Sequence, residues 1–400
     1  MRAGGSGAKL YYTADGKSMG KRELLLILSF AIVGAVVYRL TAPPSASEGG
    51  GLPVGRLIDH VKREVAGNQA AAEHTATATH PLPDEVSEVW IRPIRGRMDR
   101  IEITGTDRAD VETRLHIVSR AYDDAEAKAT AEATVLRPEQ AGATLAFEVQ
   151  FPEAGRQHAS LTIAVPSRLR IRVDTRASAL LVTGVASVEA PNAAGETSVR
   201  DVAGRVALTH QNGEVALQNV DSVRFTGRNS RLTLAAVRGD TLVALERGGG
   251  LTAARLGGAV EIDARQAEVE LRELSQTRGP LRVTANGGSV RLDELRSEAH
   301  VDGRNAEIDV RMSGAAPVTI YSQGEDVAVT PPATACSLDI AVVDGRIAPD
   351  AAIAALGLQL SGAGGTAERR ASGALKGGGP TISIRVGRGD AVLRVPEDGR

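Results

Sequence analysis

Two aspartates are the residues best placed to do chemistry. Asp263 and Asp302 occupy comparable positions in short alternating segments, with Thr284 between them. If those segments stack as neighbouring strands, the carboxylates lie two strand spacings apart, roughly 9–10 Å. This is the long end of the range for inverting glycosidases. No aromatic residue that would line a cleft and stack on a sugar is evident nearby, so we expect these aspartates to be surface charges that keep the protein soluble.

The remaining polar residues do not form a recognisable catalytic pattern. No two of the histidines have a metal-ligand spacing such as His-x3-His. No Gly-x-Ser-x-Gly elbow occurs, and the glycine runs at 248–250 and 377–379 lack a following Lys-Ser/Thr. We therefore predict no catalytic, cofactor-binding or metal site, and no enzyme. The seven histidines are His60, His74, His80, His116, His158, His210 and His300.

Two Arg-Gly-Asp tripeptides, at 238–240 and 388–390, match a sequence used by some adhesion ligands. In a chain rich in arginine and glycine, such tripeptides are expected as ordinary turn residues. We predict no recognition role for either.

The composition favours a narrow aliphatic interior. Hydrophobic residues make up 42% of the chain but aromatic residues only 2%, so the core must be built from Val, Leu, Ile and Ala. The net charge of −2 gives no overall field for nucleic acid. The single cysteine, Cys336, excludes an intramolecular disulfide, and its apolar neighbours predict a small buried residue.

The N-terminal region predicts a membrane anchor. Residues 23–41 hold an apolar run, and residues 1–22 form a basic tail that contains Lys17, Lys21 and Arg22. This charge bias predicts a cytoplasmic N-terminus and an exported remainder, either periplasmic or on the cell surface. A signal peptide cleaved near residues 45–47 is the alternative. We expect the uncleaved anchor, followed by a flexible stalk over residues 42–84.

Alternating apolar and polar residues predict strands in residues 85–165, interrupted by a helix or loop at residues 123–133. Residues 166–346 then repeat a turn followed by apolar–x–apolar pairs, with the turns about 17 to 21 residues apart. This period predicts a right-handed parallel β-helix, or β-solenoid, in which successive coils cover one another's aliphatic side chains. The turn markers include Asn212-Gly213, Asn229-Ser230, Gly249-Gly250, Gln266-Ala267, Asn286-Gly287 and Asn305.

Outward-facing charges support this stacking. When the pairs Val269/Leu271, Val290/Leu292 and Ile308/Val310 are aligned, their flanking residues fall into two columns that alternate in sign. Opposite charges on neighbouring strands stabilise the pairing. The columns are Glu270, Arg291, Asp309 and Arg272, Asp293, Arg311. Residues 347–400 break the period, and we predict a glycine-rich insert and capping strands at 381–386 and 391–395.

The layout from Ile101 to about Val395 resembles the bacterial putative-adhesin family of β-strand repeat domains, whose function is unknown. The matching features are the run that ends at Leu161–Pro166, the segment Leu169–Val173, and the repeated turn and V/L-x-V/L unit. The resemblance implies a right-handed β-helix or β-roll with an N-terminal anchor. It implies no catalytic residues.

Three functions remain open on the sequence. The leading hypothesis is a membrane-anchored structural or binding module of the bacterial envelope, whose partners are the membrane and an envelope protein or glycan, without nucleic acid. The second is a β-helix polysaccharide hydrolase or lyase that uses Asp263 and Asp302. The third is an envelope-stress accessory protein that signals through its basic N-terminal tail.

Overall fold

The structure is a computed structural model that describes residues 70–152, 156–354, 358–361 and 368–395. The predicted basic tail, the anchor at 23–41 and the stalk up to residue 69 lie outside these ranges. Within the described ranges, no helix combines the length and the apolar character needed to cross a membrane.

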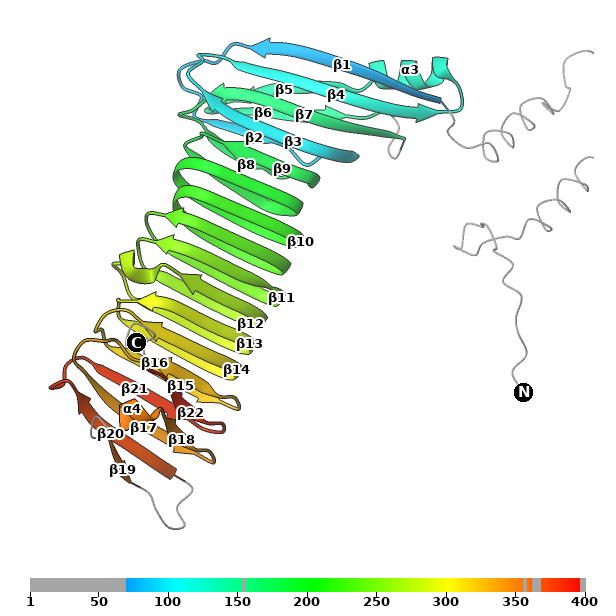
Figure 1. The fold of residues 1–400 in the computed structure, drawn as a ribbon. Coiled ribbons are helices and arrows are strands. Elements are labelled where there is room, and N and C mark those ends of the chain that lie inside the picture. Colours follow the sequence, from blue (N-terminus) through cyan, green and yellow to red (C-terminus); the bar gives the residue numbers. More distant parts are fainter. Residues whose placement is uncertain (1–69, 153–155, 355–357, 362–367, 396–400) are drawn as a thin grey trace, which may run out of the picture. The chain divides into compact units, whose positions relative to one another are not determined.

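The described chain is all-β, as predicted, with one regular helix near its N-terminal end (Figure 1). That helix, α3 (Asp124–Glu132), lies where the sequence predicted a helix or loop, and it begins at Asp123, whose carboxylate accepts the Glu126 N–H at 2.8 Å. The first strands are β1 (Ala70–His80), β2 (Glu88–Ile91), β3 (Arg97–Thr106), β4 (Val111–Ala121), β5 (Val135–Ala141), β6 (Thr144–Gln150), β7 (Gln157–Pro166), β8 (Arg170–Val173) and β9 (Ala177–Thr183).

The middle of the chain forms parallel ladders in which each strand lies beside the equivalent strand of the next repeat (Figure 1). In one ladder Val223 pairs with Thr241, Thr241 with Val260, and Val260 with Leu281. A second ladder is formed by the later half of each repeat. The strands are β10 (Ser187–Val237), β11 (Thr241–Leu256), β12 (Val260–Arg272), β13 (Leu281–Leu295), β14 (Ala299–Met312), β15 (Val318–Gln323) and β16 (Val327–Thr330).

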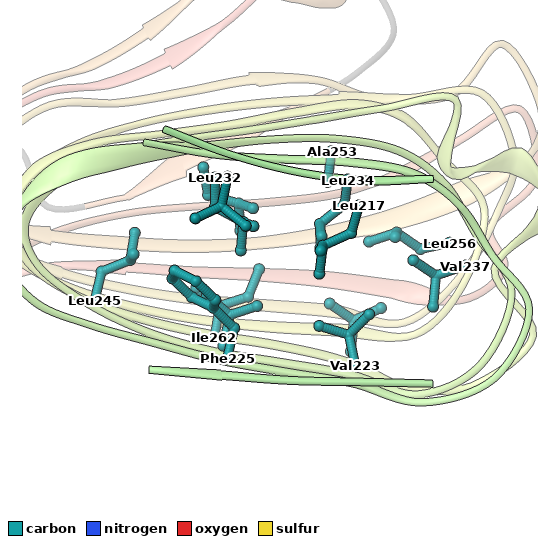
Figure 2. Packing of buried hydrophobic residues seen from close by; sticks show 14 of the residues in the cluster. Leu217, Val223, Phe225, Leu232, Leu234, Val237, Leu245, Ala253, Leu256 and Ile262 are labelled. Carbon is teal, nitrogen blue, oxygen red and sulfur yellow. The ribbon is translucent and has the colours of Figure 1, made fainter. Parts of the chain in front are cut away.

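The ladders enclose a continuous aliphatic interior, which Figure 2 shows at Leu217, Leu234 and Ala253. Leu232, Leu251, Val269, Val290 and Ile308 follow one another in register, and each is at most 1% exposed. Burial of each such side chain stabilises the fold by roughly 1.5–3 kcal/mol. Ordering the backbone opposes this by about 1–2 kcal/mol per residue, so each repeat depends on its neighbours.

The predicted turn residues adopt the left-handed backbone that tight corners require. Asn212, Asn229, Gln266 and Asn305 have φ between 50° and 58°. Asparagine tolerates this region better than most residues. The side-chain amide of Asn229 also donates to the side-chain oxygen Oδ1 of Asn212 in the preceding repeat, at 3.1 Å. A second row of corners has φ between 53° and 60° and was not predicted: Asp201, Asn219, Ala236, Arg255, Glu273 and Glu294.

The structure corrects the predicted stalk over its last part. Ala70–His80, predicted to be flexible, forms strand β1 and pairs antiparallel with β4 along its whole length. His80 donates or accepts a 3.0 Å hydrogen bond with the Thr113 hydroxyl, and its ring lies 5.1 Å from that of Phe147. The segment lacks large aliphatic residues, but eleven residues of backbone pairing with β4 order it.

At both ends of the stack, strands are inserted between others that are not their neighbours in the sequence. At the N-terminal end, β2 lies between β6 and β8, and β3 lies between β7 and β9, although β6 and β7 come later in the chain. At the C-terminal end, β21 lies between β15 and β17, and β22 lies between β16 and β18. The later strands are β17 (Cys336–Val343), β18 (Ile347–Pro349), β19 (Gln359–Ser361), β20 (Glu368–Leu375), β21 (Thr381–Val386) and β22 (Ala391–Leu393), with a short helix α4 (Ala351–Ala354).

The final strands therefore do not cap the stack as the sequence predicted. β21 and β22 form where they were expected, but they fill an internal position, and β20 covers the outer edge of β17 in antiparallel pairing. In this position β21 satisfies the backbone hydrogen-bonding groups of β15 and β17 at once.

Leu271→Ala should destabilise the protein by about 2–5 kcal/mol, because Leu271 is fully buried and the cavity cannot close between fixed ladders. Urea unfolding followed by circular dichroism would measure this. Glu268→Ala, at an exposed position three residues earlier, should change the stability by no more than about 0.5 kcal/mol. Equal effects would contradict the assigned interior.

Removal of residues 381–400 should make the protein aggregate, because it leaves β15 and β17 with open edges on either side of a vacant strand position. Removal of residues 396–400 alone retains β21 and β22 and should leave the protein monodisperse. Sedimentation velocity on both truncations would test this. A soluble 1–380 protein of unchanged stability would show that the inserted strands are dispensable.

Candidate functional site

The stack has two broad sides with different surface chemistry. The groove face consists of the outward residues of the ladder that starts at Val223. The paired face consists of the outward residues of the ladder that starts at Leu232. The groove face presents the column Arg224, Leu242, Glu261, Arg282, His300 and the column Thr226, Ala244, Asp263, Thr284, Asp302, Tyr321.

The structure brings together the two aspartates that the sequence singled out. Asp263 pairs with Thr284, and Thr284 pairs with Asp302, so all three lie in one outward column as expected. Asp263 also makes an exposed ion pair with Arg265, with 3.4 Å between Oδ2 and the guanidinium nitrogen. Two ladder steps separate the carboxylates, which leaves them on open surface rather than facing each other across a cleft.

An aromatic residue that the sequence interpretation missed lies beside this column. Tyr321 pairs with Asp302 in the next ladder step and is 47% exposed. Its ring lies 5.7 Å from that of His300, at an angle of 56° between the planes. Tyr321 is exposed beside the aspartates but does not line a cleft, so the expectation of no cleft-lining aromatic residue is not contradicted. Alignment of Val318/Ile320 with Ala299/Val301 would have placed Tyr321 beside Asp302.

A shallow groove of about 600 Å³ crosses successive strands of the groove face and ends at His300. Within the part of the chain that the structure describes, Arg224, Glu261 and Arg282 make no ion pair and no side-chain hydrogen bond. The same holds for Arg205 and Glu298, which also border the groove. The lining residues are Arg205, Ser222, Val223, Arg224, Asp240, Thr241, Leu242, Ala259, Val260, Glu261, Pro280, Leu281, Arg282, Glu298 and His300.

Charges on the paired face bind one another instead. Glu270, Arg291 and Asp309 follow one another in register, as predicted from the alternating columns. The shortest contacts run along a strand, as in the 2.6 Å pair of Arg272 with Glu270. Others run across strands or from the C-terminal segment, as in Arg311–Asp293 at 3.7 Å and Arg394–Asp309 at 3.2 Å. This face therefore uses its charges to hold neighbouring strands together.

Both Arg-Gly-Asp tripeptides make contacts within the fold. The Asp240 carboxylate accepts the Ala259 N–H at 3.0 Å, and Arg238 donates to the Val202 carbonyl at 3.3 Å. Asp390 accepts from the backbone N–H and the guanidinium of Arg346, which lowers the pKa of its carboxyl group. These contacts match the turn role expected for both tripeptides.

One histidine is buried in the aliphatic interior. His210 is fully buried, with Nε2 3.1 Å from the Gly195 carbonyl oxygen and Nδ1 2.8 Å from the Ser230 hydroxyl. Because a carbonyl only accepts, Nε2 carries the proton and Nδ1 is left to accept from Ser230. Burial lowers the pKa of His210, so the neutral ring is favoured. Its ring also stacks on Phe225, 6.5 Å away.

The other chemically reactive side chains are dispersed. Cys336 is buried, as predicted, and burial raises the pKa of its thiol. Across the described ranges, no three His, Cys, Asp or Glu side chains come close enough together to hold a metal ion.

Replacement of His210 should change the pH dependence of stability. The pKa of His210 is lower in the folded than in the unfolded chain, so the stabilisation by the neutral ring is complete above about pH 6.5 and is lost progressively as the pH falls below it. His210→Leu should be less stable at pH 8 but should lose less stability between pH 7 and pH 5. Denaturant unfolding at each pH would measure this. His300→Gln, at the surface, should keep the original slope, and equal slopes for all three proteins would contradict the assignment.

Comparisons with known proteins found structural neighbours only. No family model matches the chain, and no curated protein matches it. A putative cell adhesion protein from Clostridium sporogenes is 10% identical, with a TM-score of 0.19, over 82% of this chain and all of that one. Putative adhesins from Parabacteroides distasonis and Bacteroides fragilis are each 10% identical, with TM-scores of 0.32 and 0.30, over 64% and 80% of this chain and 96% and 97% of theirs.

Proposed function

We propose that this protein is an adhesin-like module of the bacterial envelope, built as a right-handed β-solenoid and held at the membrane by the helix predicted at residues 23–41. The exported region acts as a rigid wall that binds an envelope protein or glycan through its groove face. Its action is binding, without turnover of the ligand.

The observation that carries this proposal is the difference between the two faces. Charged residues of the paired face contact one another, as Arg272 contacts Glu270 at 2.6 Å. Arg224, Glu261 and Arg282 of the groove face have no such partners within the described chain, although they line a groove of about 600 Å³. Side chains with free hydrogen-bonding groups on a regular scaffold are suited to recognition, because the backbone that carries them loses little conformational freedom on binding.

A carbohydrate-active enzyme is the alternative, and the shared column of Asp263, Thr284 and Asp302 favours it. A hydrolase needs one carboxylic acid that protonates the leaving group and one that activates water or attacks the sugar. Asp263 and Asp302 instead point outward from one column, two ladder steps apart, and neither of them lines the groove, so the groove would not hold a glycosidic bond between the two carboxylates. Binding is therefore the better-supported function.

Cell fractionation should find the full-length protein in the membrane fraction, with residues 70–395 degraded when protease is added outside the cytoplasmic membrane. Deletion of residues 23–41 should abolish both results, because no exported anchor remains. Deletion of residues 70–395 should keep membrane association and abolish capture of envelope components by cross-linking. A full-length protein found in the cytoplasm would contradict the proposal.

Turnover assays separate the binding module from the alternative. Full-length protein incubated with a panel of envelope and plant polysaccharides should release no new reducing ends, and Asp263→Ala and Asp302→Ala should behave identically. Turnover by the unsubstituted protein that disappears in either variant would contradict the binding proposal and would show that the protein is an enzyme.

A further inference from the structure

We propose that the groove and Tyr321 together bind a linear, uncharged oligosaccharide that lies along the stack. This inference rests on the proposed binding function and names the ligand class of its groove face. Five features of the described residues carry it: the unpaired charges of the groove, their balance of sign, the pairing of the groove-face strands on both sides, the small exposed apolar area, and the exposed aromatic ring.

The charges of the groove are balanced, which argues against a charged polymer. Its lining contains the arginines 205, 224 and 282 and the carboxylates of Asp240, Glu261 and Glu298. The two signs also alternate along one ladder, where Glu261 lies beside Arg282. A polyanion or polycation would meet as many repulsive as attractive groups on such a surface. A ligand that both donates and accepts hydrogen bonds along its length uses both signs, and sugar hydroxyls do so.

The same surface is poorly suited to a peptide. Extended peptides bind by adding a strand to an open sheet edge, but β11, β12, β13 and β14 are each paired on both sides. Other peptides use apolar anchor pockets. The exposed large hydrophobic residues of the groove face are limited to Leu242 and Tyr321 in the described chain, at 38% and 47% exposure.

Tyr321 supplies the apolar contact that a sugar ring requires. It lies one ladder step beyond Asp302, and its ring lies 5.7 Å from that of His300, which lines the groove. A sugar in the groove can therefore continue onto the exposed ring of Tyr321. Its hydroxyls would there meet Asp302 and, in the adjoining outward column, Arg304, which pairs with Gln323 of the Tyr321 strand. Arg304 is exposed and makes no ion pair in the described chain.

Calorimetric titration of the full-length protein in detergent would test this. The probes are cellohexaose, chitohexaose and maltohexaose, with a heparin hexasaccharide and an extended octapeptide for comparison. At least one neutral hexasaccharide should bind, and heparin and the peptide should not. Tyr321→Ala and Arg282→Ala should each weaken that binding about tenfold, because each removes a contact worth roughly one decade of affinity. Tyr321→Phe should retain most of it, because the ring remains.

Arg272→Ala on the paired face is the matched control, and it should leave the affinity unchanged. Circular dichroism of every variant would show whether it is folded. The inference is overturned if no neutral hexasaccharide binds, if heparin or the peptide binds instead, or if Tyr321→Ala binds as well as the unsubstituted protein. Such failures leave the broader proposal standing, provided that residues 70–395 are still required to capture an envelope component.

Discussion

Parallel pairing of equivalent residues in successive repeats is the constraint on which the structure depends. Leu232, Leu251, Val269 and Val290 face inward only while their strands stay in register, because a slip of one residue would turn every aliphatic side chain outward. Each repeat is stabilised by its neighbours, so the first and last repeats are the vulnerable ones. At both ends the fold stabilises these repeats by inserting strands from elsewhere in the chain. β2 and β3 lie between strands that come later in the sequence, and β21 and β22 lie between strands that come earlier.

The same register determines the surface. Once the inward residues are fixed, every outward residue belongs to a column, and its neighbours are those of adjacent repeats. On the paired face these columns place Asp293 between Arg291 and Arg311 and thereby stabilise the stack. On the groove face they place Asp302 beside Tyr321, and they leave several charges without partners among the residues that the structure describes. The charges of the paired face thus contact one another, and the groove face is the one that we propose binds a ligand.

The repeating part of this architecture could be predicted from the sequence, because its signals are local. The alternation around Val269/Leu271 and the turn asparagines determine which residues face inward and where the chain reverses. The inserted strands could not be predicted, because nothing within Thr381–Val386 indicates that it pairs with both β15 and β17. Ala70–His80 was misassigned because its order comes from pairing with β4. Tyr321 lies beside Asp302 only through the register of one further repeat, in which Val318/Ile320 pairs with Ala299/Val301, and this long-range pairing is not evident from the local sequence.

Spin-label distances along a single outward column test the stacking most directly. Thr226, Ala244, Asp263, Thr284, Asp302 and Tyr321 occupy consecutive ladder steps. With labels at Thr226 and Asp302, and then at Thr226 and Tyr321, the backbone separations should be about 19 Å and about 24 Å, since each step adds about 4.8 Å. A distance from Thr226 to Tyr321 that equals or falls below the distance to Asp302 would contradict the stacked arrangement.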